Sequence, residues 1–291
     1  MMKYSAKDII ILDENNLRQY QMAVFDTAKE IIAFFDSEKI RYSLSGGSIL
    51  GAVRHQGFIP WDDDIDINMP RRDYNRMVRL FDEKMGDRYF LQTPEKRPEL
   101  GLMVTQIRKK GTVARRKYDW NTPAEECGVS IDIYIVENVF DNPILRFIQK
   151  NASMALSFAV AAVRFYNNRE LPPEIEAAEG RGYRFKRLKL VLGRILRVIP
   201  LKKWIAWCGF WNSACRDRTT RLVAIPTGRK HFSKEIYRRK DMCRFRKAKF
   251  EGEDVNIPVR AEKYLTDFYG DYMTLPPEDK REKHVFLELS Y

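Results

Sequence analysis

The sequence predicts an α/β (α+β) fold, with a mixed β-sheet core flanked by helices and a helical insertion. Strand patterns with period-two alternation recur at residues 40–44, 61–69 and 128–136. Helical patterns separate them, and residues 143–215 have helical character in their two longest runs. With 291 residues, of which 44% are hydrophobic, the chain can form one large domain or two modest ones.

The first half of the chain alternates between helices and strands. Apolar side chains recur at helical spacing in two places, and Gly57, Pro60 and Pro70 mark loops or ends of elements. The expected elements are, in order, a helix over 20–36, a strand over 40–44, a helical turn over 49–55, an extended segment over 61–69 and a helix over 71–81.

A turn of small residues, Gly46-Gly47-Ser48, leads into the helical run after it. Glycine has no Cβ, so the backbone N–H groups of such a turn can approach a phosphate closely. We therefore expect Gly46, Gly47 and Ser48 to bind phosphate. A Gly-Gly-Ser turn alone is also an ordinary loop feature, and it gains weight from the carboxylates that follow.

Asp64 and Asp66 follow the turn within the same short unit. If residues 61–69 are extended, both carboxylates point to one face and the intervening isoleucines to the other. Adjacent carboxylates repel each other, and a divalent cation, Mg²⁺ or Mn²⁺, is the usual remedy. We expect Asp64 and Asp66 to be catalytic metal ligands. For Asp62 and Asp63, metal binding and loop hydrogen bonding remain equally open.

The strand pattern over 128–136 carries a carboxylate among isoleucines. Its three isoleucines form one face, and Asp132 and Tyr134 form the other. A carboxylate in so apolar a strand is costly unless it is paired or bound to metal. We expect Asp132 to be a third metal ligand or the general base toward an acceptor hydroxyl, with pairing to an arginine as the alternative.

The continuous stretch 45–67, from Ser-Gly-Gly-Ser to Asp-Ile-Asp-Ile, closely resembles the LicD family. That family includes phosphocholine transferases and is related to fukutin-type ribitol-phosphate transferases. The Phe-Glu-Gly turn at 250–252 and the run 269–284 resemble it too, whereas 143–215 does not.

The resemblance implies a nucleotidyltransferase-like fold and transfer of a phospho-alcohol, such as phosphocholine, from a CDP-alcohol donor. The implied acceptor is a hydroxyl of a cell-surface glycan (lipopolysaccharide, capsule or teichoic acid) or of its lipid-linked precursor. Further candidates for binding donor or acceptor are Arg54, His55, Trp61, Arg108, Tyr272, Arg281 and His284.

The charge of the chain is uneven. The formal net charge is +12, but residues 181–250 hold 22 Lys or Arg against 3 Asp or Glu, which leaves the remainder acidic. Such asymmetry predicts an anionic partner. Basic residues beside tryptophans at 202–211 suit an anionic membrane surface. A helical hairpin packed on the core with a solvated basic face is equally open. Nucleic acid is not expected, because no aromatic-basic binding motif is present.

The four cysteines form no Cys-x-x-Cys pair, which favours a reducing compartment over disulfides or zinc. The first residues show no signal-peptide pattern, and the apolar run 151–163 is too short to span a bilayer. We expect a cytoplasmic protein, with a peripheral position on the inner face of the cell membrane as a candidate.

We expect three regions: a catalytic core over 1–140, a basic helical insertion over 141–220, and the C-terminal part of the catalytic domain over 221–291. Two other functions remain open. One is nucleotidyl transfer to a sugar or a nucleic acid, and the other is a catalytically inactive, membrane-associated scaffold.

Overall fold

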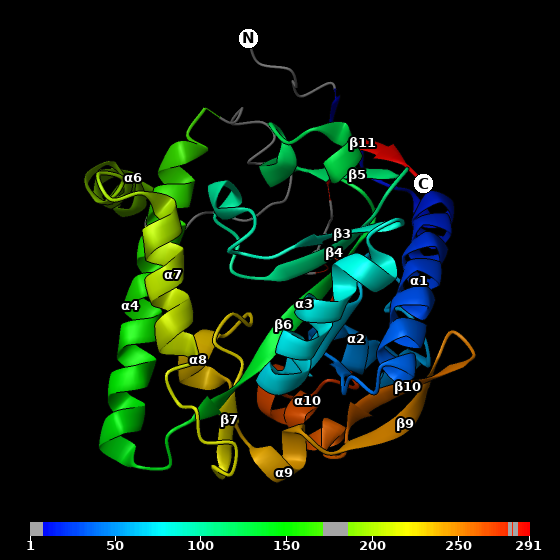
Figure 1. Cartoon of the computed structure of the whole chain (residues 1–291). Helices are drawn as coiled ribbons and strands as arrows, with labels where there is room; N and C mark the ends of the chain where they lie inside the picture. The colour runs from blue at the N-terminus through cyan, green and yellow to red at the C-terminus, as the bar shows by residue number, and fades with distance from the viewer. Residues whose placement is uncertain (1–7, 171–185, 279–280, 282–284) are drawn as a thin grey trace.

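The structure is a computed structural model that describes residues 8–170, 186–278, 281 and 285–291. Figure 1 shows a central sheet with helices packed around it. Three helices, α4, α6 and α7, gather along one flank of the sheet. They are Pro143–Asn167, Lys186–Leu196 and Leu201–Asn212. The expected helical character of 143–215 is therefore confirmed over those three ranges.

The largest sheet has the strand order β1-β2-β6-β4-β3, and β7 and β8 extend it from the far end of β6. Its strands are β1 (Ser43–Leu44), β2 (Asp66–Pro70), β3 (Tyr89–Gln92), β4 (Thr105–Lys109), β6 (Ser130–Val139), β7 (Leu222–Ala224) and β8 (Ile236–Arg238). β2 and β6 run parallel, and β6 pairs antiparallel with β4 and β7. The predicted mixed sheet flanked by helices is confirmed.

The register of β2 and β6 places Asp66 directly opposite Asp132. On the other side of β6, Gln106 of β4 is opposite Asp132. On the opposite face, Ile67, Ile131 and Ile133 are fully buried, as the alternation predicts. Burying each such side chain stabilises the fold by about 1.5–3 kcal/mol, so the register is fixed by the core.

The main helices pack their apolar faces on this sheet. They are α1 (Glu14–Ser37), α3 (Arg71–Met85) and α10 (Ala261–Tyr269), with short α8 (His231–Lys234) and α9 (Arg239–Met242) between them. α1 begins before the predicted 20–36 because Asp13 caps it, its carboxylate accepting a 2.8 Å hydrogen bond from the Asn16 N–H. Short 3₁₀ turns lie at Pro98–Leu100, Lys117–Asp119 and Ala124–Glu126.

The extended segment differs from the prediction, since β2 begins only at Asp66 rather than at residue 61. Its antiparallel partner β1 has only two residues and pairs with Ile67 and Asn68. The alternation nevertheless continues upstream, because Asp63 and Ile65 are buried and the carboxylates beside them are half-buried.

The Gly-Gly-Ser turn belongs to a helix, and two strand pairings were not predicted. The Gly-Gly-Ser residues form the first turn of α2 (Gly46–Leu50), which continues as a wider π-type turn over Gly51–His55. The strand β5 (Val113–Arg116) follows β4 but pairs with β11 (Phe286–Ser290), while β4 forms its hairpin with β3.

A hairpin forms at the Phe-Glu-Gly turn noted in the sequence. β9 (Phe245–Phe250) and β10 (Glu253–Pro258) pair around the predicted Glu251-Gly252 turn. All four cysteines are free, and three are buried. Among the described residues, no helix has both the length and the apolar content needed to cross a membrane.

Candidate active site

A cavity of about 990 Å³ opens where α2, the segment before β2, and α10 meet. One wall comes from the first half of the chain and includes Ser45, Gly46 and Gly47 of the α2 start. The other wall comes from residues 227–235 and 264–277. The floor is acidic, because Asp62, Asp64 and Asp66 all line it.

These carboxylates are positioned by backbone hydrogen bonds. The buried Gln21 of α1 donates through Nε2 to the carbonyl of Asp62 at 2.8 Å and to that of Ile59 at 3.3 Å. The Asp66 N–H donates to Ser48 Oγ at 2.9 Å, and the Asp66 carbonyl accepts from the Ser45 N–H at 2.8 Å. The start of α2 and the start of β2 are thereby locked together.

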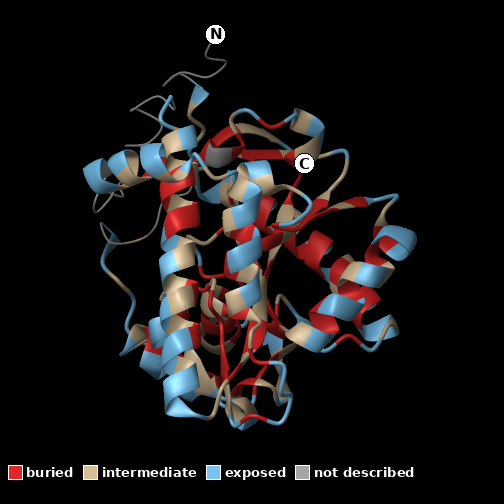
Figure 2. Cartoon of the chain, turned by 60° about the vertical axis from the view of Figure 1, so that its left-hand side comes forward, coloured by how far each residue is buried: buried red, intermediate tan, exposed pale blue. Residues whose placement is uncertain are grey.

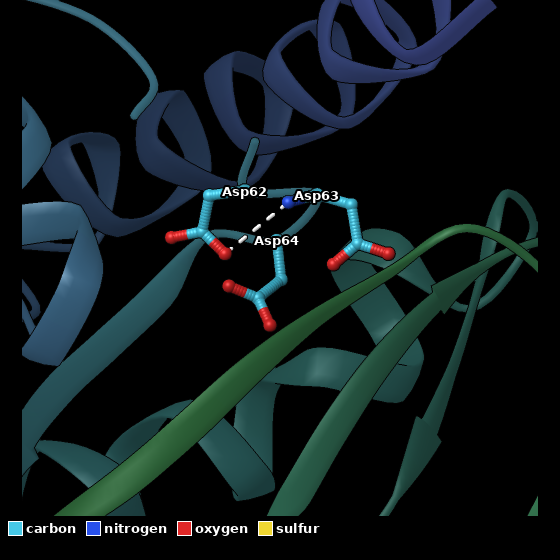
Figure 3. Close-up of side chains that lie close together, drawn as sticks. All are labelled: Asp62, Asp63 and Asp64. Carbon is cyan, nitrogen blue, oxygen red and sulfur yellow. Dashed lines mark hydrogen bonds between the residues drawn. The ribbon is translucent and has the colours of Figure 1, made fainter. Parts of the chain in front are cut away.

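Asp62, Asp63 and Asp64 each offer an oxygen within 4.8 Å of the others (Figure 3). The Asp62 carboxylate also accepts a 3.2 Å hydrogen bond from the Asp63 N–H. Asp63 is fully buried and forms an ion pair with Arg116 at 3.1 Å. Asp63 is therefore committed to Arg116, and the other two carboxylates face the cavity with Asp66.

The negative charge of this floor is incompletely balanced. Burial and the neighbouring carboxylates of Asp64 and Asp132 raise the pKa of Asp66 well above its usual range. Burial also raises the pKa of Asp132, against the hydrogen bond from Gln106 and the charge of Arg116. Raised pKa values in a carboxylate cluster mean that a further cation would be favourable there.

Asp132 lies opposite Asp66 in the sheet but is not part of the cavity wall, and a polar chain behind it holds its carboxylate. Gln106 Nε2 donates to Asp132 Oδ1 at 2.8 Å, and Gln106 Oε1 accepts from Arg108 at 2.7 Å. Arg108 also forms a buried ion pair with Asp119 at 3.0 Å. This corrects the expected donor contact of Arg108, which is 3% exposed and does not line the cavity.

The two glycines allow close approach to the carboxylates. A Cβ on Gly47 would lie 2.8 Å from Asp62 Oδ2, so any larger residue there would force the Asp62 carboxylate to move. Gly46 has a φ of +47° and lies near the Asp66 carboxylate and the Tyr269 hydroxyl. Ser48 differs from the expectation. It is buried, its hydroxyl serves the Asp66 backbone, and it is not part of the cavity wall.

The remaining candidates fall into two groups. Arg54, Trp61 and Tyr272 line the cavity, and Arg54 Nη1 donates to the Tyr272 carbonyl at 2.5 Å. His55 does not line it, and its Nε2 accepts from Arg54 at 2.9 Å.

Trp61 does not present both of its faces to the cavity. The Arg281 guanidinium lies over its ring at 4.4 Å, so Arg281 reaches the site through this stacking contact rather than as part of the wall. His284 lies outside the described residues.

Several wall residues were not predicted. Tyr134 shares the face of Asp132 two residues earlier, a signal that was present in the alternation of β6. Arg116 could not be identified in this way, because the neighbouring sequence does not distinguish it from Arg115. In the structure, Arg115 is buried on the other face of the strand. Glu235 and Tyr264 come from the distant second wall.

Comparisons with known proteins identify related sequences. Residues 39–154 match a family described as LicD/FKTN/FKRP, nucleotidyltransferase domain, which confirms the resemblance noted in the sequence. The lipopolysaccharide cholinephosphotransferase LicD of Haemophilus influenzae is 26% identical over 275 residues, 94% of this chain and 97% of that protein.

Two other relatives match shorter stretches. The ribitol 5-phosphate transferase FKRP of Homo sapiens is 36% identical over 64 residues, 22% of this chain and 13% of that protein. An uncharacterized protein of Rickettsia prowazekii is 31% identical over 70 residues, 22% of this chain and 26% of that protein.

Proposed function

Because the chain carries a nucleotidyltransferase domain of the LicD family, we propose that it transfers a phospho-alcohol from a CDP-alcohol donor to a glycan hydroxyl. The named activities of two relatives, cholinephosphotransferase and ribitol 5-phosphate transferase, support the reaction class. The similarity to the former extends over nearly the whole chain, which favours phosphocholine as the group transferred.

The observation that carries the proposal is the acidic floor of the cavity. Asp62, Asp64 and Asp66 face a space large enough for a nucleotide, beside a glycine-rich helix start. Phosphoryl transfer needs little covalent help from a protein and depends on positioning and charge stabilisation. A cavity of this composition supplies both.

The residues present fit a divalent cation, which we propose to be Mg²⁺ or Mn²⁺. All donors are carboxylate oxygens, the ligand type that these hard cations prefer. The raised pKa of Asp66 reflects burial and repulsion by carboxylates that a cation would neutralise. Asp64 and Asp66 would hold the ion, with Asp62 as a further ligand, which leaves Asp132 as the general base rather than a third ligand. When bound, it would neutralise the donor diphosphate and the leaving nucleoside monophosphate.

The protein residues then have distinct tasks. We propose that backbone N–H groups at Gly46 and Gly47 and the guanidinium of Arg54 bind the donor phosphates. Asp132 would accept the proton of the acceptor hydroxyl, whose oxygen attacks the phosphorus that bears the alcohol. The bond from that phosphorus to the bridging oxygen breaks, and CMP leaves with the electron pair. A raised pKa suits a general base, because it brings proton affinity closer to neutral pH.

The proposed acceptor is a cell-surface glycan or its lipid-linked precursor, made on the inner side of the membrane. The similarity to the lipopolysaccharide cholinephosphotransferase of Haemophilus influenzae supports a glycan acceptor. A lipid-linked acceptor would bring a cytoplasmic enzyme to the membrane surface.

Phosphorus NMR tests the proposal. The full chain would be mixed with Mg²⁺ and a panel of CDP-alcohols, with and without a membrane glycan extract. We expect CMP to appear from one donor, and mainly in the presence of extract. Asp66→Asn should remove this activity, while Asp82→Asn, on the exposed side of α3, should keep it.

The same spectra separate the alternatives. Release of pyrophosphate from a nucleoside triphosphate, without CMP from any CDP-alcohol, would replace the proposal with nucleotidyl transfer. No cleavage of any donor, together with no metal binding by calorimetry, would favour a non-catalytic scaffold.

A further inference from the structure

The three helices α4, α6 and α7 contain no acidic residue. Together they hold nine Lys or Arg residues and no Asp or Glu. Of these, Arg187, Arg194, Lys202 and Lys203 are exposed. This layer of helices therefore contributes only positive charge to one flank of the protein.

The same layer exposes an unusual amount of apolar surface. Of the sixteen large apolar side chains that are most exposed among the described residues, eleven lie between 144 and 210. They are Ile144, Leu145, Phe147, Ile148, Phe158, Leu188, Val191, Ile195, Val198, Trp207 and Phe210. Figure 2 brings this flank forward and shows its helices exposed or half-buried on their outer side. We call these eleven residues the outer apolar face.

This exposure follows helical spacing. On α4, Ile144, Ile148 and Phe158 share one side of the helix, and on α6 the exposed residues Leu188, Val191 and Ile195 do the same. Phe147 is 63% exposed and Val198, just after α6, is 84% exposed. Two neighbouring amphipathic helices therefore turn their apolar sides outward.

The inner side of α4 is already occupied by protein. Gln149 and Ser153 hydrogen-bond Asn212 of α7 at 3.2 and 2.5 Å. Met154 packs against Phe232 of α8, in a cluster with strand residues. Because the inner side is fully used, the outer apolar face is the surface left for a partner in the described part of the chain.

We propose that this layer docks on an anionic lipid bilayer, with the outer apolar face in the headgroup region and the basic residues on lipid phosphates. Basic amphipathic helices with Trp, Phe and Leu bind membrane interfaces through these two contributions together. The proposal places the contact on α4 as well as on the basic segment that begins at residue 181.

Charge and composition argue against other occupants. A second copy of the chain would bring two basic layers together, which is repulsive. Nucleic acid would use the basic residues but would leave eleven large apolar side chains without a role.

The docking layer also borders the cavity. α8 packs on the inner side of α4, and its first residue His231 lines the cavity wall, as does Glu235 just beyond it. A bilayer at the outer side would therefore lie one helix layer from the site. Vesicle binding itself needs neither donor nor metal, so the docking proposal can fail or succeed independently of the proposed reaction.

Co-sedimentation of the full chain with vesicles tests the proposal. The vesicles would contain phosphatidylcholine alone or phosphatidylcholine with phosphatidylglycerol. We expect binding to the anionic vesicles that weakens with added salt, and much weaker binding to the neutral ones. Lys202→Glu with Lys203→Glu should lower partitioning by at least about tenfold. Phe147→Ser with Ile195→Ser should lower it as well, because the apolar contribution is lost.

Matched control variants locate the contact. Arg244→Glu with Lys247→Glu reverses two exposed charges of the same basic segment, near β9, and should leave binding nearly unchanged. Ile11→Ser removes an exposed apolar side chain outside the layer and should also have no effect. Circular dichroism melting curves would show that each variant is folded.

Three results would overturn the proposal. One is no binding to anionic vesicles, and another is binding that the Arg244 and Lys247 variant loses while the helix variants keep it. The third is a concentration-dependent dimer in light scattering that Phe147→Ser with Ile195→Ser abolishes, without vesicle binding, because the layer would then be an interface between copies.

Discussion

Gln106 Nε2 donates a 2.8 Å hydrogen bond to Asp132 Oδ1. The same Gln106 accepts from Arg108, which pairs with Asp119 inside the protein. The carboxylate of Asp132 is therefore oriented by side chains on β4 and on the turn after β5. These residues do not line the cavity and act on the proposed chemistry through Asp132.

Removing this support should impair transfer without unfolding the protein. We expect Gln106→Ala to lower kcat by about 10- to 100-fold, the usual effect of losing a residue that orients an active-site side chain. The pH–rate profile should shift too, because the hydrogen bond from Gln106 lowers the pKa of Asp132. Gln19→Ala, at an exposed position on α1, is the matched control. An unchanged profile would remove Gln106 from the site.

The carboxylates of the cavity floor should be far more sensitive. Asp64→Asn and Asp66→Asn should each lower turnover by roughly a thousandfold or more, since a bound ion contributes several kcal/mol to the transition state. Titration calorimetry with Mn²⁺ should show weakened ion binding in both. The unfolding midpoint without metal should rise or stay level, because each change removes repulsion. Full activity in both variants would exclude them as metal ligands.

Two glycine-to-alanine variants distinguish a glycine that a close contact requires from one that only lowers helix stability. Gly47→Ala should displace the Asp62 carboxylate, because the new methyl group would lie 2.8 Å from Oδ2, and activity should fall. Gly209→Ala, inside α7, meets nothing closer than 3.9 Å and should stabilise the protein by about 0.5–1 kcal/mol. Urea unfolding and the CMP assay measure both effects. Equal behaviour of the two variants would contradict the close approach at Gly47.

Glu235 should make stability depend on pH. Burial raises its pKa from 4.5 to about 7. Between these values the folded protein keeps a proton that the unfolded chain has lost. Stability must therefore fall as pH rises through this window, by roughly 3 kcal/mol at about 1.4 kcal/mol per pKa unit.

Glu235→Gln should remove that contribution. Urea unfolding at pH 5 and pH 8 would compare it with the unaltered protein and with Glu253→Gln, at an exposed position on β10. From pH 5 to pH 8, Glu235→Gln should lose less stability than the unaltered protein does. Glu253→Gln should lose as much as the unaltered protein. The same pH dependence in all three proteins would disprove the assignment.

Strong local periodicity predicted much of the fold. α1, α3 and β6 have long amphipathic or alternating patterns, and the turn at Glu251-Gly252 identified its hairpin. The prediction missed β3 and β11, which are short and depend on partners elsewhere in the chain. β11 pairs with β5, and this pairing depends on contacts that no local pattern encodes.

The positions of the candidate site residues could also be predicted only where a local pattern marks them. Asp62, Asp64 and Asp66 alternate with buried residues, which is a local pattern. The alternation extends upstream of β2, which begins at Asp66. Arg108 was misplaced because the sequence does not show whether a basic residue of a strand faces a cavity or a buried carboxylate, here Asp119. Glu235 and Tyr264 reach the cavity only because the chain returns to the sheet after the helical layer.

The two walls of the cavity have separate origins in the chain. The acidic floor and glycine-rich helix start lie within residues 39–154, the part that matches the family, whereas the opposite wall comes from residues 227–277. Under the proposed function, the acidic floor would supply the chemistry and the opposite wall would contact the alcohol or the acceptor. Exchanging the wall residues of 227–277 for those of a relative should then change the preferred substrate while the reaction stays the same.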